Sequence, residues 1–514
     1  REAWSVYENP AIYYVASEPL DNAETSLAQA IARSQKVAVK APERRQTKAF
    51  AYTDFGPASA VTSEEYVEDA DAHLITFANN VRLNFKQTSF DTGSINIRVR
   101  VGHGFMSMPK KDEGLRRLGL NVLNASGVAE HTADDLSSLF AGRRVAAITR
   151  TRVDNDAFEI LGSTDADDLS AQLNLMTAKV AAPAFREEIA EQHFRKMRAW
   201  YPTHEAAPKS VADKYIPRLI RSGDKRYGYD DLESFVSPTL AQVRNWIGPE
   251  LANGPIEITV VGDVEKDTVV AEIARTFGAL PTRDERKSDF GELADLEFPS
   301  GDTAPTRFYH KGSDEQALVY VYWPAPDASD PADAYRMRVL RSVLRNRLTA
   351  ELREAMGATY SPGVGAFSNR IFKGYGYLVA RVTAKPEDAN KVRAGILRVA
   401  RQMVESGVEP DEFERAFRPL VEDLDSTLQN NSYWLSVLGD AQSGAFGLQR
   451  FRSQAPTYDA MNPKEIGALA RDLFGGNEQN VSYFILPSPD NKVAGKGRVT
   501  AANLDTERRN GSDQ

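Results

Sequence analysis

Two widely separated stretches of the chain show the same pattern of apolar and polar positions. Residues 95–101 and residues 316–322 alternate with a period of two, which predicts strands that are buried on one face. Each stretch is followed by a segment with apolar residues at helical spacing, over residues 113–125 and 330–356. A strand and then a helix, occurring twice in the same order, predict an internal repeat.

The order of the later elements extends this repeat. We expect the first copy to continue with strands at 145–152 and 158–163, helices from 164 and after 183, and a closing strand at 256–261. We expect the second copy to continue with strands at 359–367 and 375–382, helices from 386 and 410, and a closing strand at 481–486. This order predicts an α+β fold of two repeated domains, each a mostly antiparallel sheet with helices packed on one face.

The breaks in the pattern divide the chain into four parts. Residues 1–64 hold one expected strand and one expected helix, which are too few to bury a core, so we interpret them as the tail of a preceding domain and a linker. The first repeat domain is expected over 65–298 and the second over 299–490, and a polar tail that frays over 491–514. Because the chain begins with neither Met nor an apolar signal segment, we expect it to be a piece of a longer polypeptide.

Composition narrows the class of protein. The chain has 514 residues, of which 42% are hydrophobic and 26% charged, as in ordinary globular proteins with more than one domain. Its net charge of -9 argues against nucleic acid or an anionic membrane as the main partner. The chain has no cysteine, which excludes disulfides and thiolate metal sites. We also expect no membrane span, because no apolar stretch is long enough.

Three segments carry a resemblance to a known family. Residues 77–83 look like an opening strand, residues 261–264 with 277–281 look like the end of a domain, and residues 352–361 look like a substrate-holding segment. In this order and spacing, the chain resembles the insulinase or pitrilysin type of zinc metallopeptidase, the inverzincins. The resemblance covers about residues 65–490. It implies that the chain is the C-terminal, non-zinc half of a two-half, clamshell-shaped member.

The resemblance also identifies where a zinc motif should stand. The family's His-x-x-Glu-His motif, carried by a helix, aligns with residues 113–125, where the two histidine positions hold Arg117 and Asn121 and the glutamate position holds Leu120. A guanidinium has only donors and cannot bind a cation, and leucine cannot act as a base. No two of the six histidines are three to five residues apart. We therefore expect no metal bound by this chain, and zinc in the missing N-terminal half or in a partner subunit.

Arg353 and Tyr360 are the candidate catalytic and substrate-binding residues. Arg353 stands in the last turn of an expected helix and Tyr360 begins the strand that returns. A phenol can donate to a carbonyl oxygen that becomes negative in a tetrahedral intermediate, and a guanidinium can supply positive charge nearby. The resemblance implies that the pair faces the zinc site of the other half. The structural alternative is a cation at a helix C-terminus and a half-buried strand tyrosine.

The predicted function follows from this combination. We expect the C-terminal half of a zinc-dependent endopeptidase or oligopeptidase, which holds a peptide or unfolded polypeptide and is inactive alone. The alternative is a non-catalytic scaffold or partner subunit of the same family, with no role in hydrolysis. The look of related two-half proteins favours the periplasm, with the cytoplasm as the alternative.

A run of arginines on the expected helix of the second repeat has two interpretations. Its members are Arg336, Arg338, Arg341, Arg345 and Arg347. We favour a solvated helix surface whose arginines pair with acids, and the alternative is a patch that binds an acidic substrate.

Overall fold

The computed structural model describes residues 21–36, 48–110, 113–151, 156–287, 289–300, 304–356, 362–444, 446–476 and 479–492. The chain divides into two compact units, Arg1–Lys48 and Ala49–Gln514. The first unit contains helix α1, Ala23–Gln35, which was predicted. The predicted strand at 12–15 and the tail from residue 493 onward lie outside the described residues. All other described elements belong to the second unit.

Within the described residues, seven strands form the first sheet, in the order β1-β2-β3-β7-β4-β6-β5. The pairing of β3 with β7 is parallel, and the other pairings are antiparallel. The bounds are β1 Val61–Val67, β2 Ala72–Phe77, β3 Arg82–Gln87, β4 Ile95–Val101, β5 Ile148–Arg150, β6 Phe158–Thr164 and β7 Ile256–Gly262.

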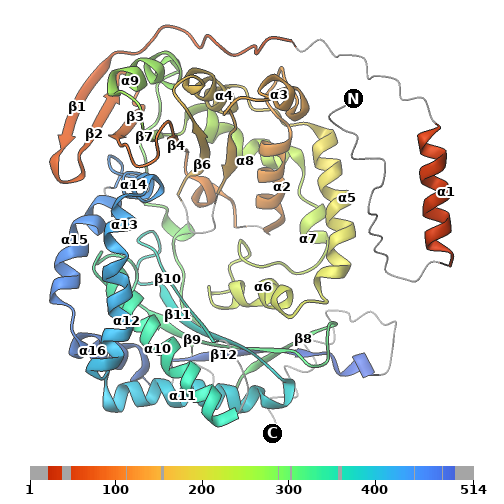
Figure 1. Ribbon diagram of the computed structural model, residues 1–514, viewed down its shortest axis with the longest axis vertical. Coiled ribbons are helices and arrows are strands. Elements are labelled where there is room, and N and C mark those ends of the chain that lie inside the picture. Colours follow the sequence, from red (N-terminus) through yellow and green to blue (C-terminus); the bar gives the residue numbers. More distant parts are fainter. Residues whose placement is uncertain are drawn as a thin grey trace. The chain divides into compact units, whose positions relative to one another are not determined.

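Most helices of the first repeat cover one face of the first sheet (Figure 1). The bounds are α2 Glu113–Ala125, α3 Ala133–Leu139, α4 Leu169–Ala181, α5 Glu187–His204, α6 Pro208–Leu219, α7 Glu233–Val236, α8 Leu240–Asn253 and α9 Lys266–Arg275. Helices α2, α4, α8 and α9 place their apolar residues in one core with β2, β3, β4, β6 and β7. The predicted stripe of α2, including Leu118 and Val122, is fully buried there.

Five described strands form the second sheet, in the order β10-β11-β9-β12-β8. The bounds are β8 Thr306–His310, β9 Ala317–Ala325, β10 Gly363–Ser368, β11 Gly376–Ala384 and β12 Val481–Pro487. The pairing of β8 with β12 is parallel, and the other pairings are antiparallel. Strand β10 is the outermost strand on one side of the sheet.

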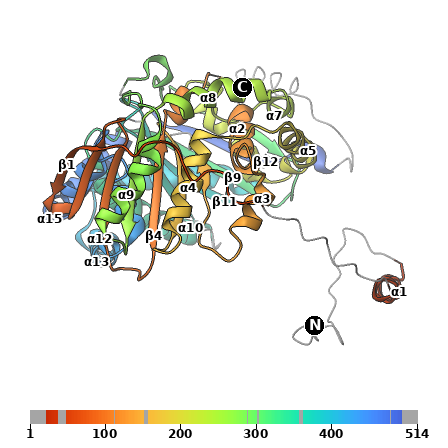
Figure 2. The ribbon, with the colours of Figure 1, turned by 90° about the horizontal axis from the view of Figure 1, so that it is seen from above.

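The helices of the second repeat pack mainly on one face of the second sheet. The bounds are α10 Asp333–Met356, α11 Ala389–Ser406, α12 Pro410–Glu422, α13 Leu424–Leu428, α14 Asn431–Val437, α15 Phe446–Ala460 and α16 Pro463–Phe474. Helices α10, α11, α12 and α16 form a core with β9, β11 and β12. Their ribbons lie together on one side of this sheet (Figure 1), and Figure 2 shows α10 and α12 from a second direction.

The two sheets repeat the same topology, which confirms the predicted α+β fold. The order β3-β7-β4-β6-β5 of the first sheet matches β8-β12-β9-β11-β10 of the second, and each begins with the parallel pair. The hairpin β1-β2 is an addition to the first sheet, next to β3. The repeat is therefore a repeat of strand order and not only of element order.

Each sheet is also covered on its other face by a segment of the opposite repeat. On the first sheet this face is polar: Asn84 donates to the carbonyl of Leu438 at 2.6 Å, and Arg82 donates to the carbonyl of Gln442 at 2.9 Å. We call the set Arg82, Asn84, Arg100, Glu257 and Thr259 the polar face. Residues 438–443, which follow α14, lie against it.

The second sheet presents aromatic side chains on the corresponding face. We call the set Tyr320, Tyr322, Tyr377, Val379 and Arg381 the tyrosine face. Helix α6 of the first repeat packs against it through an apolar cluster that includes Val211, Ile216 and Ile220. The sequence predicted helices on one face of each sheet. It did not predict that a segment of the opposite repeat covers the other face of each sheet.

Some details of the prediction were wrong. Residues 77–83 are not one opening strand, because they comprise the end of β2, the turn at 78–81, in which Asn80 has a φ of 65°, and the start of β3. Strands β1 and β8 were not predicted, and β1 begins at Val61, before the expected start of the first repeat. The division at 65–298 and 299–490 stays a prediction. No described helix is long and apolar enough to cross a membrane.

Candidate functional site

Helix α2 carries the three positions that the zinc motif would occupy. Its apolar side packs into the core of the first sheet, which leaves Arg117, Leu120 and Asn121 half-buried on the other side. The register of the helix therefore presents these three side chains where a metal-binding motif would have to stand. The question is whether their chemistry fits a zinc ion.

Arg117 does not fit zinc. Its Nε lies 3.4 Å from a carboxylate oxygen of Glu113, and its guanidinium carbon lies 5.5 Å from the ring centre of Trp200 and 5.3 Å from that of Phe235. A guanidinium held between a carboxylate and two aromatic faces is a stable cation with no lone pair to offer. Leu120 has no ligating atom at all. The residues present thus do not suit the zinc site of the family.

The electrostatics near Arg117 also oppose a second cation. Burial, together with the charges of Arg117 and Lys196, lowers the pKa of His193 to about 4. Burial and Arg117 lower the pKa of His204 as well. Both imidazoles are neutral at pH 7, but they stand beside a permanent positive charge. Among the described residues, no three His, Asp or Glu side chains gather in a way that could hold a metal ion.

The predicted pair of Arg353 and Tyr360 can be followed only in part. Arg353 is exposed in the last turn of α10. Tyr360 lies outside the described residues, as does Gly357, the predicted end of that helix. Strand β10 begins shortly afterwards, at Gly363. Whether the two side chains converge therefore stays a prediction.

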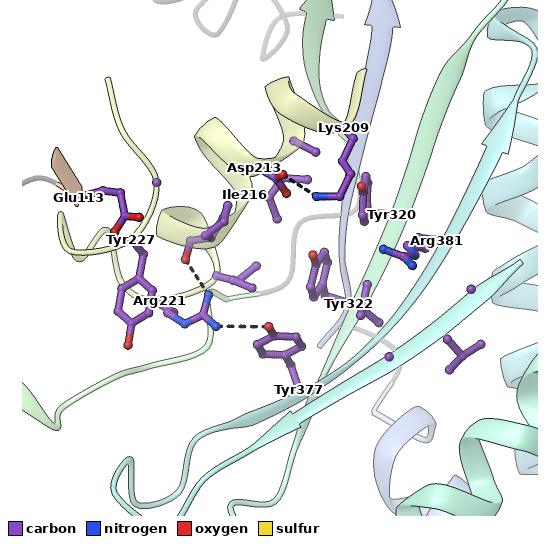
Figure 3. A pocket seen from close by; sticks show the side chains of 18 of the residues that line it. Glu113, Lys209, Asp213, Ile216, Arg221, Tyr227, Tyr320, Tyr322, Tyr377 and Arg381 are labelled. Atoms are coloured by element: carbon purple, nitrogen blue, oxygen red, sulfur yellow. Dashed lines mark hydrogen bonds and ion pairs between the residues drawn. The ribbon is translucent and has the colours of Figure 1, made fainter. Parts of the chain in front are cut away.

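A cavity of about 730 Å³ lies between the two repeats, which we call the inter-repeat cavity (Figure 3). Helix α6 forms one wall and the tyrosine face of the second sheet forms another. Glu113 and Arg117 reach it from α2, so one of the three positions that the zinc motif would occupy borders it. The other polar and charged residues that line it are Lys209, Asp213, Arg221, Tyr227, Tyr229, Tyr320, Tyr322, Arg341, Arg345, Tyr377 and Arg381.

Arg221 is the most buried cation of this cavity, with an exposed fraction of 5%. Its Nη1 donates to the carbonyl of Pro217 at 3.0 Å, and its Nη2 donates to the Tyr377 hydroxyl at 3.2 Å. The guanidinium carbon lies 4.4 Å from the ring centre of Tyr227. Figure 3 shows the side chain of Arg221 between α6 and the second sheet.

The tyrosines of β9 supply neutral donors. Burial raises the pKa of Tyr320 to about 12, and burial also raises the pKa of Tyr322 well above its usual value. Both phenols therefore keep their protons at neutral pH. Neither hydroxyl makes a hydrogen bond to another described residue, whereas the Tyr377 hydroxyl already accepts from Arg221. The cavity wall thus offers hydrogen-bond donors to a ligand.

Sequence reasoning missed this cavity, although one signal for it was present. Its lining comes from α2, α6, α10 and the strands of the second sheet, which are far apart along the chain. The alternation of Tyr320 and Tyr322 with Val319 and Val321 was read as one buried face. The valines do enter the core, and the tyrosines consequently point to the opposite face, toward α6.

Comparison with known sequences identifies relatives. A family profile described as the peptidase M16 inactive domain matches residues 240–420, from α8 of the first repeat to α12 of the second. The chloroplastic stromal processing peptidase of Pisum sativum is 19% identical over 446 residues, which are 76% of this chain and 35% of that protein. The probable zinc protease PqqL of Haemophilus influenzae is 20% identical over 330 residues, 62% of this chain and 33% of that protein.

Solved structures show the same fold. The periplasmic protease PqqL of Escherichia coli superposes with a TM-score of 0.72 at 15% identity, covering 91% of this chain and 51% of that chain. A variant of the ferredoxin protease FusC, in complex with Arabidopsis ferredoxin, gives a TM-score of 0.71 at 12% identity and the same coverage. This chain spans about half the length of these two structures and about a third of the curated relatives. Residues 240–420 thus match the inactive domain of the M16 peptidases, and the relatives and solved structures that resemble this chain are M16, or insulinase-type, proteases.

Proposed function

We propose that this chain is the C-terminal half of a zinc-dependent endopeptidase or oligopeptidase, and that it holds peptide substrate for a zinc site located elsewhere. The observation that carries the proposal is the inter-repeat cavity, which borders helix α2 at Arg117, a position where the resemblance would put a metal ligand. A cavity with this wall can bind a chain segment, and the described residues that line it include no cluster of ligands that could hold a metal ion. Binding and cleavage are then divided between two halves.

The cavity suits a peptide in extended form. Residues 362–365 line it and lead into β10, the outermost strand of the second sheet. An outer strand can accept one more strand through main-chain hydrogen bonds, while side chains enter the neighbouring pockets. The substrate would be a peptide or an unfolded polypeptide, because only an unstructured segment can add to a sheet in this way.

Arg353 and Tyr360 would act on the peptide bond. In the proposal, the Tyr360 hydroxyl donates to the carbonyl oxygen as it becomes negative in the tetrahedral intermediate, and Arg353 supplies positive charge nearby. The exposure of Arg353 at the end of α10 is compatible with contact to a second half. These residues are therefore catalytic in the assembled protease and inactive without it.

Zinc and the remaining partner are assigned to the N-terminal half or to a separate zinc-bearing subunit. The names of the relatives support a zinc protease that acts on polypeptides: one is a probable zinc protease, and FusC is crystallised with a protein. For the compartment we favour the periplasm, as for the PqqL of Escherichia coli, with the cytoplasm as the alternative. The pea relative is chloroplastic, so the family itself occupies more than one compartment.

The test is Tyr360→Phe in the assembled protease, meaning this chain together with its zinc-bearing half. Loss of one donor to the tetrahedral intermediate should lower kcat by about 100- to 1,000-fold with little change in KM. Tyr66→Phe is the matched control, because Tyr66 is 53% exposed on β1, outside the residues that line the cavity. Equal kcat for Tyr360→Phe and the control would contradict the proposed role.

The alternative function is a scaffold or partner subunit that takes no part in hydrolysis. The match to an inactive domain favours it as much as it favours a substrate-holding half. The same experiment separates the two, because a scaffold would leave kcat unchanged in Tyr360→Phe and in Arg353→Ala. Arg338→Ala, an exposed arginine on the same helix outside the cavity lining, is the control for the second variant.

A further inference from the structure

We propose that the inter-repeat cavity recognises a carboxylate of the bound peptide, either an acidic side chain or the C-terminal carboxylate. This inference rests on the proposed peptide-holding function and names the substrate class within it. It is carried by a set of cationic and phenolic donors that the rest of the protein leaves without acidic partners.

The cavity has a charge opposite to that of the chain. Among the described residues that line it, six are cationic and two are acidic, whereas the whole chain has a net charge of -9. Both acids are already paired: Asp213 lies 2.5 Å from Lys209, and Glu113 pairs with Arg116 and Arg117. The remaining cations have no carboxylate within ion-pair distance among the described residues, and they are Arg221, Arg341, Arg345 and Arg381. The cavity therefore holds uncompensated positive charge.

Arg221 is the strongest single indication. Only 5% of its surface is exposed to solvent. Its guanidinium donates to one carbonyl and one hydroxyl, and its Nε has no hydrogen-bond partner among the described residues. A buried charge without a counter-ion is costly, and a carboxylate that enters the cavity would offset that cost. A guanidinium also matches the planar, two-oxygen geometry of a carboxylate better than an ammonium does.

The arginine run of α10 divides at the cavity. Outside it, Arg336 pairs with Asp330 and Asp333, and Arg347 pairs with Glu412 at 2.6 Å. Arg338 is exposed outside the cavity and has no ion pair with an acid among the described residues. Arg341 and Arg345 line the cavity, where Arg341 donates to the carbonyl of Val364, at 3.2 Å, and to no acid that the structure describes. Pairing with acids thus explains Arg336 and Arg347 and not the two arginines that line the cavity.

The electrostatic environment of Arg341 also indicates that the arginines of the cavity lack acidic neighbours. Burial and the neighbouring charges of Arg338 and Arg345 lower the pKa of Arg341, as expected where positive charges stand together without acids. Across the cavity, the hydroxyls of Tyr320 and Tyr322 add neutral donors to the same space. A carboxylate is the peptide group that accepts from all of these donors.

The test is the binding of fluorescein-labelled, unstructured peptides to the purified chain, followed by fluorescence anisotropy. Four peptides are compared, which share their sequence except at one central position. That position is Glu or Gln, and each version has either a free or an amidated C-terminus. If an acidic side chain is recognised, the Gln peptides bind at least about tenfold more weakly, and if the terminus is recognised, the amidated peptides do. Equal affinity for all four peptides would overturn the inference and leave the proposed peptide-holding function intact. Failure of every peptide to bind would count against both.

Variants test whether the cavity is responsible. Arg345→Gln combined with Arg381→Gln removes two exposed cations of the cavity, so folding should be preserved. We expect this double variant to reduce the preference for the carboxylate peptide by about tenfold. Arg198→Gln combined with Arg401→Gln makes the same charge change at exposed positions outside the cavity, and it should keep the preference. Equal loss in both double variants would show a general charge effect and would overturn the assignment to the cavity.

Discussion

The polar face of the first sheet and the tyrosine face of the second occupy corresponding positions in two sheets of the same strand order, yet they are used differently. The polar face is closed by residues 438–443, and Gln442 alone donates to the carbonyls of Ile75 and Leu83 and to the side chain of Asn84. The tyrosine face is covered by α6 over only part of its area, and the remainder lines a cavity of about 730 Å³.

This difference teaches that one repeated architecture can serve stability on one side and binding on the other. Polar groups that are buried and satisfied restrain the packing of the two repeats. Donors that face a cavity without partners are costly in the free protein and become useful only with a ligand. Changes to the polar face should therefore affect unfolding, whereas changes to the tyrosine face should affect peptide affinity.

Removal of a buried charge beside the polar face should have the largest effect. Asp156 is 7% exposed, its carboxylate lies 2.5 Å from Arg100, and it also lies near Arg286. Asp156→Asn leaves Arg286 without a carboxylate within ion-pair distance among the described residues and leaves Arg100 with only Glu257, at 3.7 Å. The free energy of unfolding should therefore fall by about 3–5 kcal/mol. Urea unfolding measures this, with Asp411→Asn, which breaks an exposed pair with Arg415, as a control that should cost under about 1 kcal/mol. A cost as small as the control would contradict the account.

Loss of the Gln442 side chain should have the next largest effect. It accepts from the Thr76 hydroxyl in addition to its three donated hydrogen bonds, and Gln442→Ala leaves Asn84 and two strand carbonyls short of a partner. We expect a loss of about 2 kcal/mol in the free energy of unfolding, with peptide affinity unchanged. Gln402→Ala, at an exposed position of α11, is the matched control. A weakened peptide affinity in Gln442→Ala would remove the separation between the two faces.

The pH dependence of stability should distinguish the regions by sign and by window. Burial opposes the charge of Asp156, but Arg100 and Arg286 outweigh it and lower its pKa, so its stabilising contribution persists until the pH falls below about 4. His193, beside Arg117, has its pKa lowered to about 4 in the folded protein. Between pH 6.5 and pH 4 the unfolded chain therefore binds more protons at this residue than the folded chain does, and the free energy of unfolding decreases as the pH falls through that window. His193→Gln should remove about 2 kcal/mol of the loss between pH 7 and pH 5. Parallel curves for the wild type and the variant would refute this.

A hydroxyl on the tyrosine face should have the smallest effect on stability and a selective effect on binding. Tyr322→Phe removes a hydroxyl donor that faces the cavity. The free energy of unfolding should therefore change by under about 1 kcal/mol, while peptide affinity falls a few-fold. Tyr335→Phe is the contrasting control, because the Tyr335 hydroxyl donates to the carbonyl of Arg450 at 2.8 Å, away from the cavity. It should lose about 1 kcal/mol of stability and no affinity. A loss of affinity in Tyr335→Phe but not in Tyr322→Phe would contradict the assignment of the ligand-facing donors to the tyrosine face.

The fold was largely predictable, and its exceptions have physical causes. Strand β4 and helix α2 were predicted with their observed bounds, because alternation and a helical stripe are strong local signals. Strand β1 was missed because it is an exposed edge strand without a buried face until Val67. The turn at Asn79 and Asn80 was taken for a strand, although asparagine tolerates the positive φ that Asn80 adopts.

The candidate site was less predictable. The unsuitability of Arg117, Leu120 and Asn121 for zinc follows from side-chain chemistry, which needs no structure. The inter-repeat cavity depends on α6 crossing to the second sheet, and no local pattern in residues 208–219 specifies that contact. The roles of Arg353 and Tyr360 depend on a second half and stay a prediction.

The division between holding and cutting a peptide is tested most directly by mass spectrometry of an unstructured peptide incubated with the purified chain and added zinc. The account predicts that the peptide remains intact at concentrations where anisotropy shows it to be bound, with and without EDTA. Cleavage by the purified chain that EDTA abolishes would contradict it, because a metal site would then have to exist within this chain.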